Sequence, residues 1–500
     1  MKPHLVIFFV FALALTVAAQ KAVKEPNPTP TPERPREIVA LLNDARLAAP
    51  ELAVDTFLKV VESKKVTDPV WRKEIIDEAL RMTDDVQYPM PMWPAYGGQN
   101  ELNDTEEYIL ASAFRSKLDR LSFKGRVIEL LLETEPLRAK QMIFQMGGDL
   151  GLKPRPCEEI LTYSADEMYP VVGKVAAAVF TEKQIAEGER ALFIAPWIEN
   201  IDSPTQIYPI VDLIQKTQGS QAERQILFSA LAKAINRDFK DDRSFTFSQA
   251  RFNLAAKIGK LSAVDGDPLK ADVINAYRSM LIKNLRGTRC TDNEIKKDQP
   301  LPDYIEAANK LMPDKPLTYE DVIASELKGT AKVSHLFKKS AASLKLRDEC
   351  IVARGIKIVD NKIVKSSLDD LEWAANTTEF VDRLLAFADK DNLTESEALI
   401  FKNGCMGALI TYIDTGDLRK SIFRRYLRLL SASNLQKTSF MEWHFWLQMA
   451  KMQSPELFAE IAPEFPNHNL KVMIAASKLL EEPKKETTKS APAPTPKTSQ

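Results

Sequence analysis

Apolar residues recur at helical spacing in one segment of this chain after another. The first such stripe consists of Ile38, Leu41, Leu42 and Ala45. Steps of three and four residues place these side chains on one face of an α-helix, whereas a β-strand would need alternation. Because about twenty segments carry stripes of this kind, the patterning predicts an all-α fold.

Glycine usage agrees with a helical fold. The chain has 17 glycines among 500 residues, about half of the average usage. Glycine costs about 1 kcal/mol in a helix interior, so its scarcity favours helices. An all-β or α/β architecture would need more glycine for its turns.

The connections between the predicted helices are short. A third helix is expected to begin at Asp68-Pro69, where Asp68 can cap the helix and proline suits the first helical position. Short loops between amphipathic helices predict helical hairpins stacked into an irregular α-solenoid. In rhythm and helix length these segments resemble the tetratricopeptide and HEAT classes, and more broadly secreted bacterial α-helical solenoid proteins. No complete copy of the tetratricopeptide pattern occurs, and the resemblance implies a fold but no particular activity.

One segment departs from helical spacing. In residues 351–364, alternating Ile and Val flank Asp360-Asn361. Alternation around such a pair predicts a short β-hairpin.

The ends of the chain differ in composition from its body. Residues 1–19 read as a signal peptide, residues 20–34 as a proline-rich disordered linker, and residues 482–500 as a disordered tail. Residues 35–481 are then the α-helical body. Its composition, judged from 45% hydrophobic and 27% charged residues in the whole chain, is ordinary for a globular protein.

The signal-peptide interpretation depends on three features of residues 1–19. Lys2 precedes an apolar run from Leu5 to Val17, and small residues follow up to Ala19. The run is short for a membrane span, and a signal peptidase needs small residues before the cut. We therefore expect an exported protein, periplasmic or extracellular, with no membrane insertion after cleavage. No cysteine follows the run, so we expect no lipid anchor.

Four cysteines bear on this expectation, because disulfides persist outside the cytoplasm. Cys290 and Cys350 both follow predicted helix ends in polar surroundings, and we expect these two to be bridged. Cys405 lies in line with apolar residues on a predicted helix, which favours a buried thiol. Cys157 is the fourth, and the spacings alone leave other pairings open.

Charge and motifs limit the classes of function. The chain has 68 basic and 69 acidic residues, and such near-neutrality argues against nucleic acid or an anionic membrane as the main partner. The basic run Arg419–Arg428 interleaves with apolar residues at helical spacing, which indicates an amphipathic helix with a solvated basic face. No phosphate-binding loop, dinucleotide fingerprint, Gly-x-Ser-x-Gly or His-Glu-x-x-His occurs. We therefore expect no cofactor, no metal site and no recognisable catalytic site.

A loop rich in aromatic residues and methionine is one candidate for partner binding. The segment Gln87–Asn103 interrupts the helical pattern and carries the candidates at its centre. These are Tyr88, Met92, Trp93 and Tyr96. Long loops are usually functional or disordered, and disordered loops seldom hold so many large side chains. The alternative is a loop that folds back onto the protein's own core.

A second candidate is the aromatic run Glu442–Trp446. Trp443 and Trp446 would supply a binding surface if they faced solvent. Aromatic stripes at helical spacing are more often core, so a helix packed on two sides is the competing interpretation.

Together these features favour a secreted or periplasmic helical scaffold that binds another macromolecule, a protein or peptide, without catalysis. One alternative is an extracytoplasmic hydrolase whose carboxylates only the fold brings together. The other is a structural spacer with no specific ligand.

Overall fold

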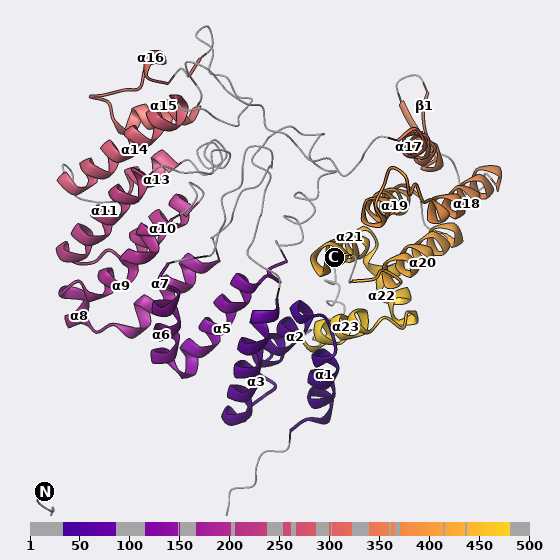
Figure 1. Cartoon of the computed structure of the whole chain (residues 1–500), viewed down its shortest axis with the longest axis horizontal. Helices are drawn as coiled ribbons and strands as arrows, with labels where there is room; N and C mark the ends of the chain where they lie inside the picture. Colours follow the sequence, from indigo (N-terminus) through magenta and orange to yellow (C-terminus); the bar gives the residue numbers. More distant parts are fainter. Residues whose placement is uncertain are drawn as a thin grey trace, which may run out of the picture.

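The computed structural model describes most of the chain between residues 34 and 480 (Figure 1). The described residues are 34–86, 116–148, 150, 167–201, 206–237, 254–261, 267–286, 300–301, 303–322, 340–359, 362–365, 371–413, 416–435 and 438–480.

This part of the chain is predominantly helical, which confirms the all-α prediction. The first half contains α1 (Arg36–Arg46), α2 (Pro50–Glu62), α3 (Pro69–Met82), η1 (Thr83–Asp85), α5 (Arg120–Thr134), α6 (Pro136–Met146), α7 (Met168–Val179), α8 (Glu182–Ala186), α9 (Glu189–Glu199), α10 (Ile207–Thr217), α11 (Gln221–Ile235), α13 (Leu254–Gly259), α14 (Pro268–Arg286), α15 (Asp303–Leu311) and α16 (Tyr319–Val322). The second half contains α17 (Ala341–Ala353), β1 (Ile356–Val359), β2 (Lys362–Lys365), α18 (Leu371–Ala386), α19 (Glu395–Tyr412), α20 (Asp417–Ser431), α21 (Phe440–Gln453), α22 (Pro455–Ile461), η3 (Ala462–Glu464) and α23 (His468–Leu480).

Local sequence signals set several helix starts. The Asp68 carboxylate accepts from the Val70 amide at 3.0 Å and Pro69 opens α3, as the sequence predicts. The buried Asp119 caps α5 by accepting from the amides of Leu121 and Ser122. In each case the side chain satisfies a backbone donor that the first helical turn leaves without a partner.

The two strands, β1 and β2, are the only β-strands among the described residues. β1 and β2 pair antiparallel, with Ile356 opposite Lys365 and Val359 opposite Lys362. They overlap the range 351–364 in which a hairpin is predicted, but residues 351–353 belong to the end of α17.

The helices from α7 to α16 pack in two layers. In one layer α7 packs on α10, α10 on α13 and α13 on α15; in the other α9 packs on α11, α11 on α14 and α14 on α16. Figure 1 shows the whole array as an arc, with α7, α10 and α13 on its inner side and α8, α9 and α11 on its outer side. We refer to the first set as the inner layer.

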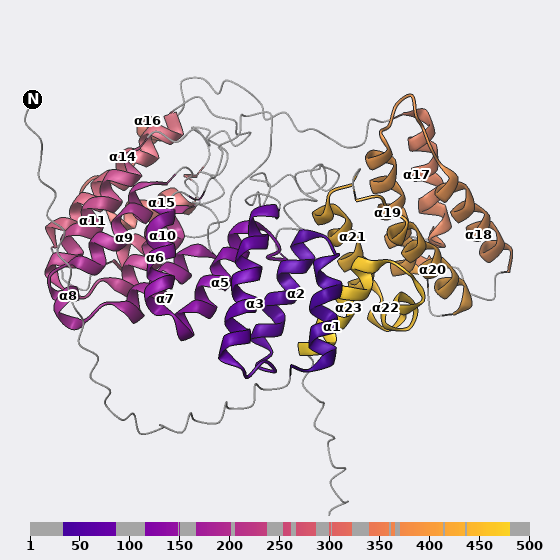
Figure 2. The ribbon, with the colours of Figure 1, turned by 60° about the horizontal axis from the view of Figure 1, so that its bottom comes forward.

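The chain enters this arc near its middle. From α1 the first half runs to one end of the arc at α15 and α16, while α17 lies at the other end and the second half runs back to α23 (Figures 1 and 2). There α23 packs on both α1 and α2. Two hydrogen bonds join these helices, from the Ala49 amide to Asn469 Oδ1 at 2.9 Å and between His468 Nε2 and the Asp44 carbonyl at 2.7 Å. The helical unit at the centre of the arc is thus built from both ends of the body.

This closure explains why α2 is buried on almost every side. The apolar residues Phe57 and Leu58 are buried, but so are Val54 and the carboxylate residues Glu51 and Asp55. The helix packs on α1, α3, α5 and α23 at once. Asp55 pairs with Arg126 of α5 at 2.8 Å and with Lys59 at 2.6 Å, so its buried charge is compensated.

The basic run on α20 has the predicted amphipathic form. Ile422, Phe423 and Leu427 are buried, while Arg424 and Arg425 form ion pairs with neighbouring elements. These two arginines therefore link α20 to η3 and to α18.

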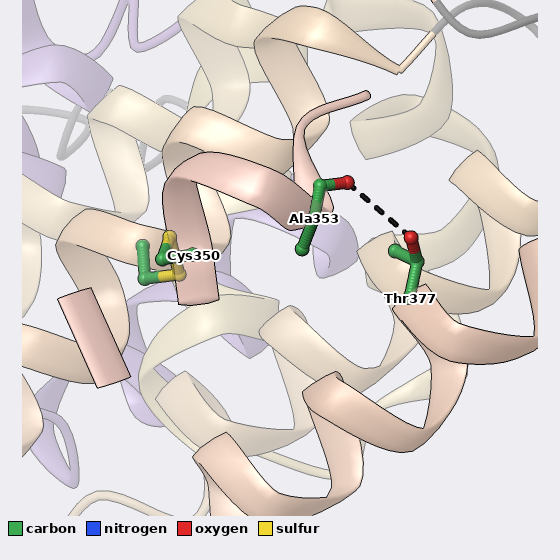
Figure 3. Close-up of a disulfide and its surroundings, with 4 residues drawn as sticks. Cys350, Ala353 and Thr377 are labelled. Carbon is green, nitrogen blue, oxygen red and sulfur yellow. Dashed lines mark hydrogen bonds between the residues drawn. A yellow bond between two sulfur atoms is a disulfide. The ribbon is translucent and has the colours of Figure 1, made fainter. Parts of the chain in front are cut away.

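The disulfide differs from the one expected. Cys350 of α17 is bonded to Cys405 of α19, with 6.2 Å between their Cα atoms, so the predicted pair Cys290–Cys350 is wrong (Figure 3). Both sulfur atoms lie where α17 packs on α19, and Cys405 is buried as expected but is not a free thiol. Helix packing, rather than position in the sequence, brings the two cysteines within bonding distance. Cys157 and Cys290 lie outside the described residues.

Candidate partner-binding site

A groove runs between α7 and α10, two neighbouring helices of the inner layer. Its volume is about 510 Å³. Its lining residues are Tyr169, Pro170, Gly173, Lys174, Ala177, Arg190, Tyr208, Pro209, Asp212, Leu213, Lys216 and Thr217. Steps of three and four residues along each helix show that one face of α7 and one face of α10 form its walls.

Small residues on α7 make the floor of this groove. A side-chain Cβ at Gly173 would lie 3.1 Å from Leu213 Cδ1, so the absence of a side chain lets the two helices approach closely. Ala177, one turn further along α7, is exposed. Above Gly173 and Ala177 the groove has room for a side chain of another molecule.

The two walls begin with the same sequence pattern. Tyr169-Pro170-Val171-Val172 opens α7, and Tyr208-Pro209-Ile210-Val211 opens α10. Proline is well accommodated in the first turn of a helix because the missing amide would have no intrahelical partner there. The same pattern thus stands at the start of both helices, which pack directly on each other.

Tyr208 marks one edge of the groove. Lys257 of α13 lies over its ring, 4.6 Å from the centroid, and pairs with Asp212. The hydrogen bond from Lys257 to Asp212 raises the pKa of this lysine, and burial partly opposes that shift. The ammonium group is therefore charged, and it holds Asp212 and the Tyr208 ring in fixed positions.

Three cations line the groove, and two of them are paired. Lys174 pairs with Glu129 at 2.5 Å. Arg190 is committed to Glu223, which it contacts at 2.7 and 2.9 Å, and it also donates to the Thr217 carbonyl. Lys216 is exposed and has no ion-pair partner within the described part of the chain. Lys216 is thus the charged group that is available to a ligand in the groove.

The sequence-predicted residues lie elsewhere. Tyr88, Met92, Trp93 and Tyr96 fall outside the described residues, so their role stays a prediction.

The aromatic run on α21 is part of the core. Trp443 is 2% exposed and its Nε1 donates to the Leu430 carbonyl at 3.0 Å, while Trp446 is 9% exposed and packs against Phe445. The interpretation of Trp443 and Trp446 as a binding surface is therefore corrected. Both rings serve to pack α21 against its neighbours.

Sequence analysis missed the α7–α10 groove because each helix reads only as amphipathic. One signal could have found it, namely the repeated Tyr-Pro-Val/Ile-Val pattern. It predicts that α7 and α10 stack side by side in the same layer, with the residues between their apolar faces forming a shared surface.

Neither a metal centre nor a membrane span is evident in the described regions. Within them no three His, Cys, Asp or Glu side chains are grouped as a metal ion would require. None of the described helices combines the length and apolar character needed to cross a bilayer.

Comparison with known proteins gives no relative: no family model, no curated protein and no solved structure matches the chain.

Proposed function

We propose that the protein is an exported, non-catalytic helical scaffold that binds a segment of another protein. In this proposal the paired helices form an irregular α-solenoid, a class of fold that exposes long surfaces suited to partner binding. The observation that carries the proposal is the α7–α10 groove, which combines a small-residue floor, an aromatic edge and an uncommitted lysine.

The chemistry of the groove favours a particular kind of segment. An apolar side chain of the partner would lie over Gly173 and Ala177, against the Tyr208 ring. A carboxylate of the partner would pair with Lys216. Because Asp212 is already bound to Lys257, it opposes that carboxylate less than a free aspartate would.

The disulfide supports the exported location. A bridge such as Cys350–Cys405 persists in oxidising compartments and is rare where thiols are kept reduced. Together with the signal-peptide features of residues 1–19, it favours a periplasmic or extracellular site of action without a lipid anchor.

Filling the groove should abolish partner binding. Ala177→Leu places a large side chain on the floor, and because Ala177 is exposed the substitution should not disturb the core. We expect it to reduce capture of the partner by about tenfold or more. A tenfold loss corresponds to about 1.4 kcal/mol, and the few residues that dominate an interface are each worth about 2 kcal/mol or more. Capture is measured by cross-linking the chain to exported proteins of the native host and quantifying enriched proteins by mass spectrometry.

Ala178→Leu is the matched control, because Ala178 is also exposed on α7 but does not line the groove. A protein enriched by the wild type and by Ala178→Leu, but lost with Ala177→Leu and weakened with Lys216→Glu, would support the proposal. Equal enrichment by all four chains would show that the groove is not the binding site.

A further inference from the structure

A larger groove lies at the far end of the second half, between α17 and α18. Its volume is about 980 Å³. It is lined by Ala341, Leu344, Lys345, Asp348, Glu349, Val352, Ala353, Glu372, Trp373, Asn376, Thr377, Phe380 and Arg383. These positions are again one face of each helix, and we call this surface the end face.

The end face exposes large apolar side chains beside its groove. Val352 is 72% exposed and Leu371, next to the lining residue Glu372, is 80% exposed. α17 and α18 are the last helices at this end of the arc (Figures 1 and 2), and on their other side α17 packs on α19 and α18 on α20. The terminal unit of a helical stack needs a polar outer face to stay soluble alone, whereas this one exposes Val352 and Leu371. Such a surface indicates an interaction site.

The two helices run in opposite directions. Glu349 of α17 pairs with Arg383 of α18 at 2.7 Å, and the Thr377 hydroxyl donates to the Ala353 carbonyl at 3.3 Å (Figure 3). Lys345 precedes Glu349 by one turn, and Glu372 precedes Thr377. These two residues therefore lie at opposite ends of the groove and on opposite walls.

The charged residues that line the groove differ in whether they have an ion-pair partner. Glu349 and Arg383 pair with each other, and Asp348 pairs with Arg347. Neither Lys345 nor Glu372 forms an ion pair with another residue that the structure describes. Among the residues that the structure describes, one cation and one anion without an ion-pair partner thus lie at opposite ends of the groove and on opposite walls.

We propose that the end face binds the end face of a second copy of this chain, forming a two-fold symmetric dimer. A two-fold interface must be self-complementary, because each patch meets its own copy. A two-fold axis in the plane of contact, perpendicular to the line from Lys345 to Glu372, places Lys345 of each copy against Glu372 of the other. The same surface supplies both the protruding Val352 and the groove that receives a side chain. A second copy of the chain would therefore both cover the exposed apolar side chains and pair with the two charges.

The Cys350–Cys405 disulfide favours binding through the end face. It fixes α17, one wall of the groove, to α19 behind it. A wall held in place before association loses less conformational entropy when the dimer forms. The inference is independent of the α7–α10 groove, although a dimer would present two such grooves to a partner.

Charge reversal with rescue tests the pairing. The oxidised chain should be dimeric by sedimentation velocity and light scattering. Lys345→Glu and Glu372→Lys should each raise the dissociation constant of the dimer by about tenfold, because each places two like-charged contacts in a symmetric interface. The K345E/E372K double variant should restore dimerisation, since both ion pairs re-form with opposite polarity. A purely structural role for these two residues would give no rescue.

An apolar pair of variants provides the control. Val352→Asp should make the chain monomeric, whereas Val70→Asp on α3, where Val70 is 63% exposed, should leave it dimeric. Thermal melting followed by circular dichroism checks that both variants are folded. If V352D does not fold, the K345E/E372K double variant tests the dimer interface instead. A wild-type chain that stays monomeric up to its solubility limit, or a dimer unaffected by V352D and by both reversals, would overturn the proposal. Binding of a different protein to the end face of a monomeric chain would also overturn the proposal.

Discussion

His444 shows how a single buried residue can make the stability of this protein depend on pH. Its ring lies within α21, stacked on Phe440 with 5.6 Å between the centroids. Its Nδ1 has no hydrogen-bond partner among the described residues. Burial lowers the pKa of His444 to about 4, and the positive charges of Lys59 and Lys451 act in the same direction. The negative charge of Asp55 raises this pKa but does not outweigh the other effects. The folded protein therefore holds this imidazole in its neutral form.

We predict a loss of stability on acidification that depends on His444. An unfolded histidine has a pKa of about 6.5, so below that pH the unfolded chain binds a proton that the folded chain rejects. The free energy of unfolding should therefore fall between about pH 6.5 and pH 4, by up to roughly 3 kcal/mol from this residue alone. In His444→Phe this part of the pH dependence should vanish, and at pH 7 the variant should be at least as stable, because an unpartnered buried nitrogen is removed. Denaturant unfolding of both proteins at several pH values measures the difference, and parallel pH profiles would contradict the prediction.

At the scale of single elements, the sequence predicts most of what the structure shows. The stripe from Ile38 to Ala45 is the buried face of α1, and Asp68-Pro69 begins α3 as expected. An apolar stripe tells which face of a helix is covered but not which helix covers it. Sequence alone therefore could not show whether Cys350 forms a disulfide with Cys290 or with Cys405. It also could not show whether Trp443 is buried or exposed. Those outcomes depend on how α17, α19 and α21 pack.

The Cys350–Cys405 bridge should contribute strongly to the stability of α17. It closes a loop of 55 residues, which the chain-entropy model values at about 4 kcal/mol. Reduction, or the C350S/C405S double variant, should lower the denaturant midpoint of the second half and increase amide exchange in α17.

Peptide mapping without reduction checks the pairing behind this prediction. It should recover Cys350 joined to Cys405 in the wild type and equally in Cys290→Ala. Recovery of Cys350 joined to Cys290, or an oxidised chain no more stable than the reduced one, would rule the assignment out.

At the scale of the whole molecule, the path of the chain is the feature least accessible to sequence analysis. Amphipathic patterns predict a stack of helices in chain order, with α1 at one end and α23 at the other. In the structure these two helices meet in the middle of the arc, because α23 packs on α1 and α2 (Figure 2). The α7–α10 groove likewise depends on packing between helices that are not consecutive in the chain, since α8 and α9 lie between α7 and α10.

This arrangement predicts that α23 couples the two halves of the protein. Its buried side chains include Leu470, Val472 and Met473, each worth roughly 1.5–3 kcal/mol when fully buried. A chain ending before α23 should therefore expose the apolar surface of α1 and α2 and lose the hydrogen bond from the Ala49 amide to Asn469. Hydrogen exchange in α1, α2 and α21 should become faster. In contrast, α9 and α11, whose main helix contacts in the described part of the chain are with other helices of the first half, should stay protected. A control chain lacking only residues 482–500 should exchange like the wild type. Uniformly faster exchange throughout the truncated chain, or no change in α1 and α2, would show that the halves are not joined through α23.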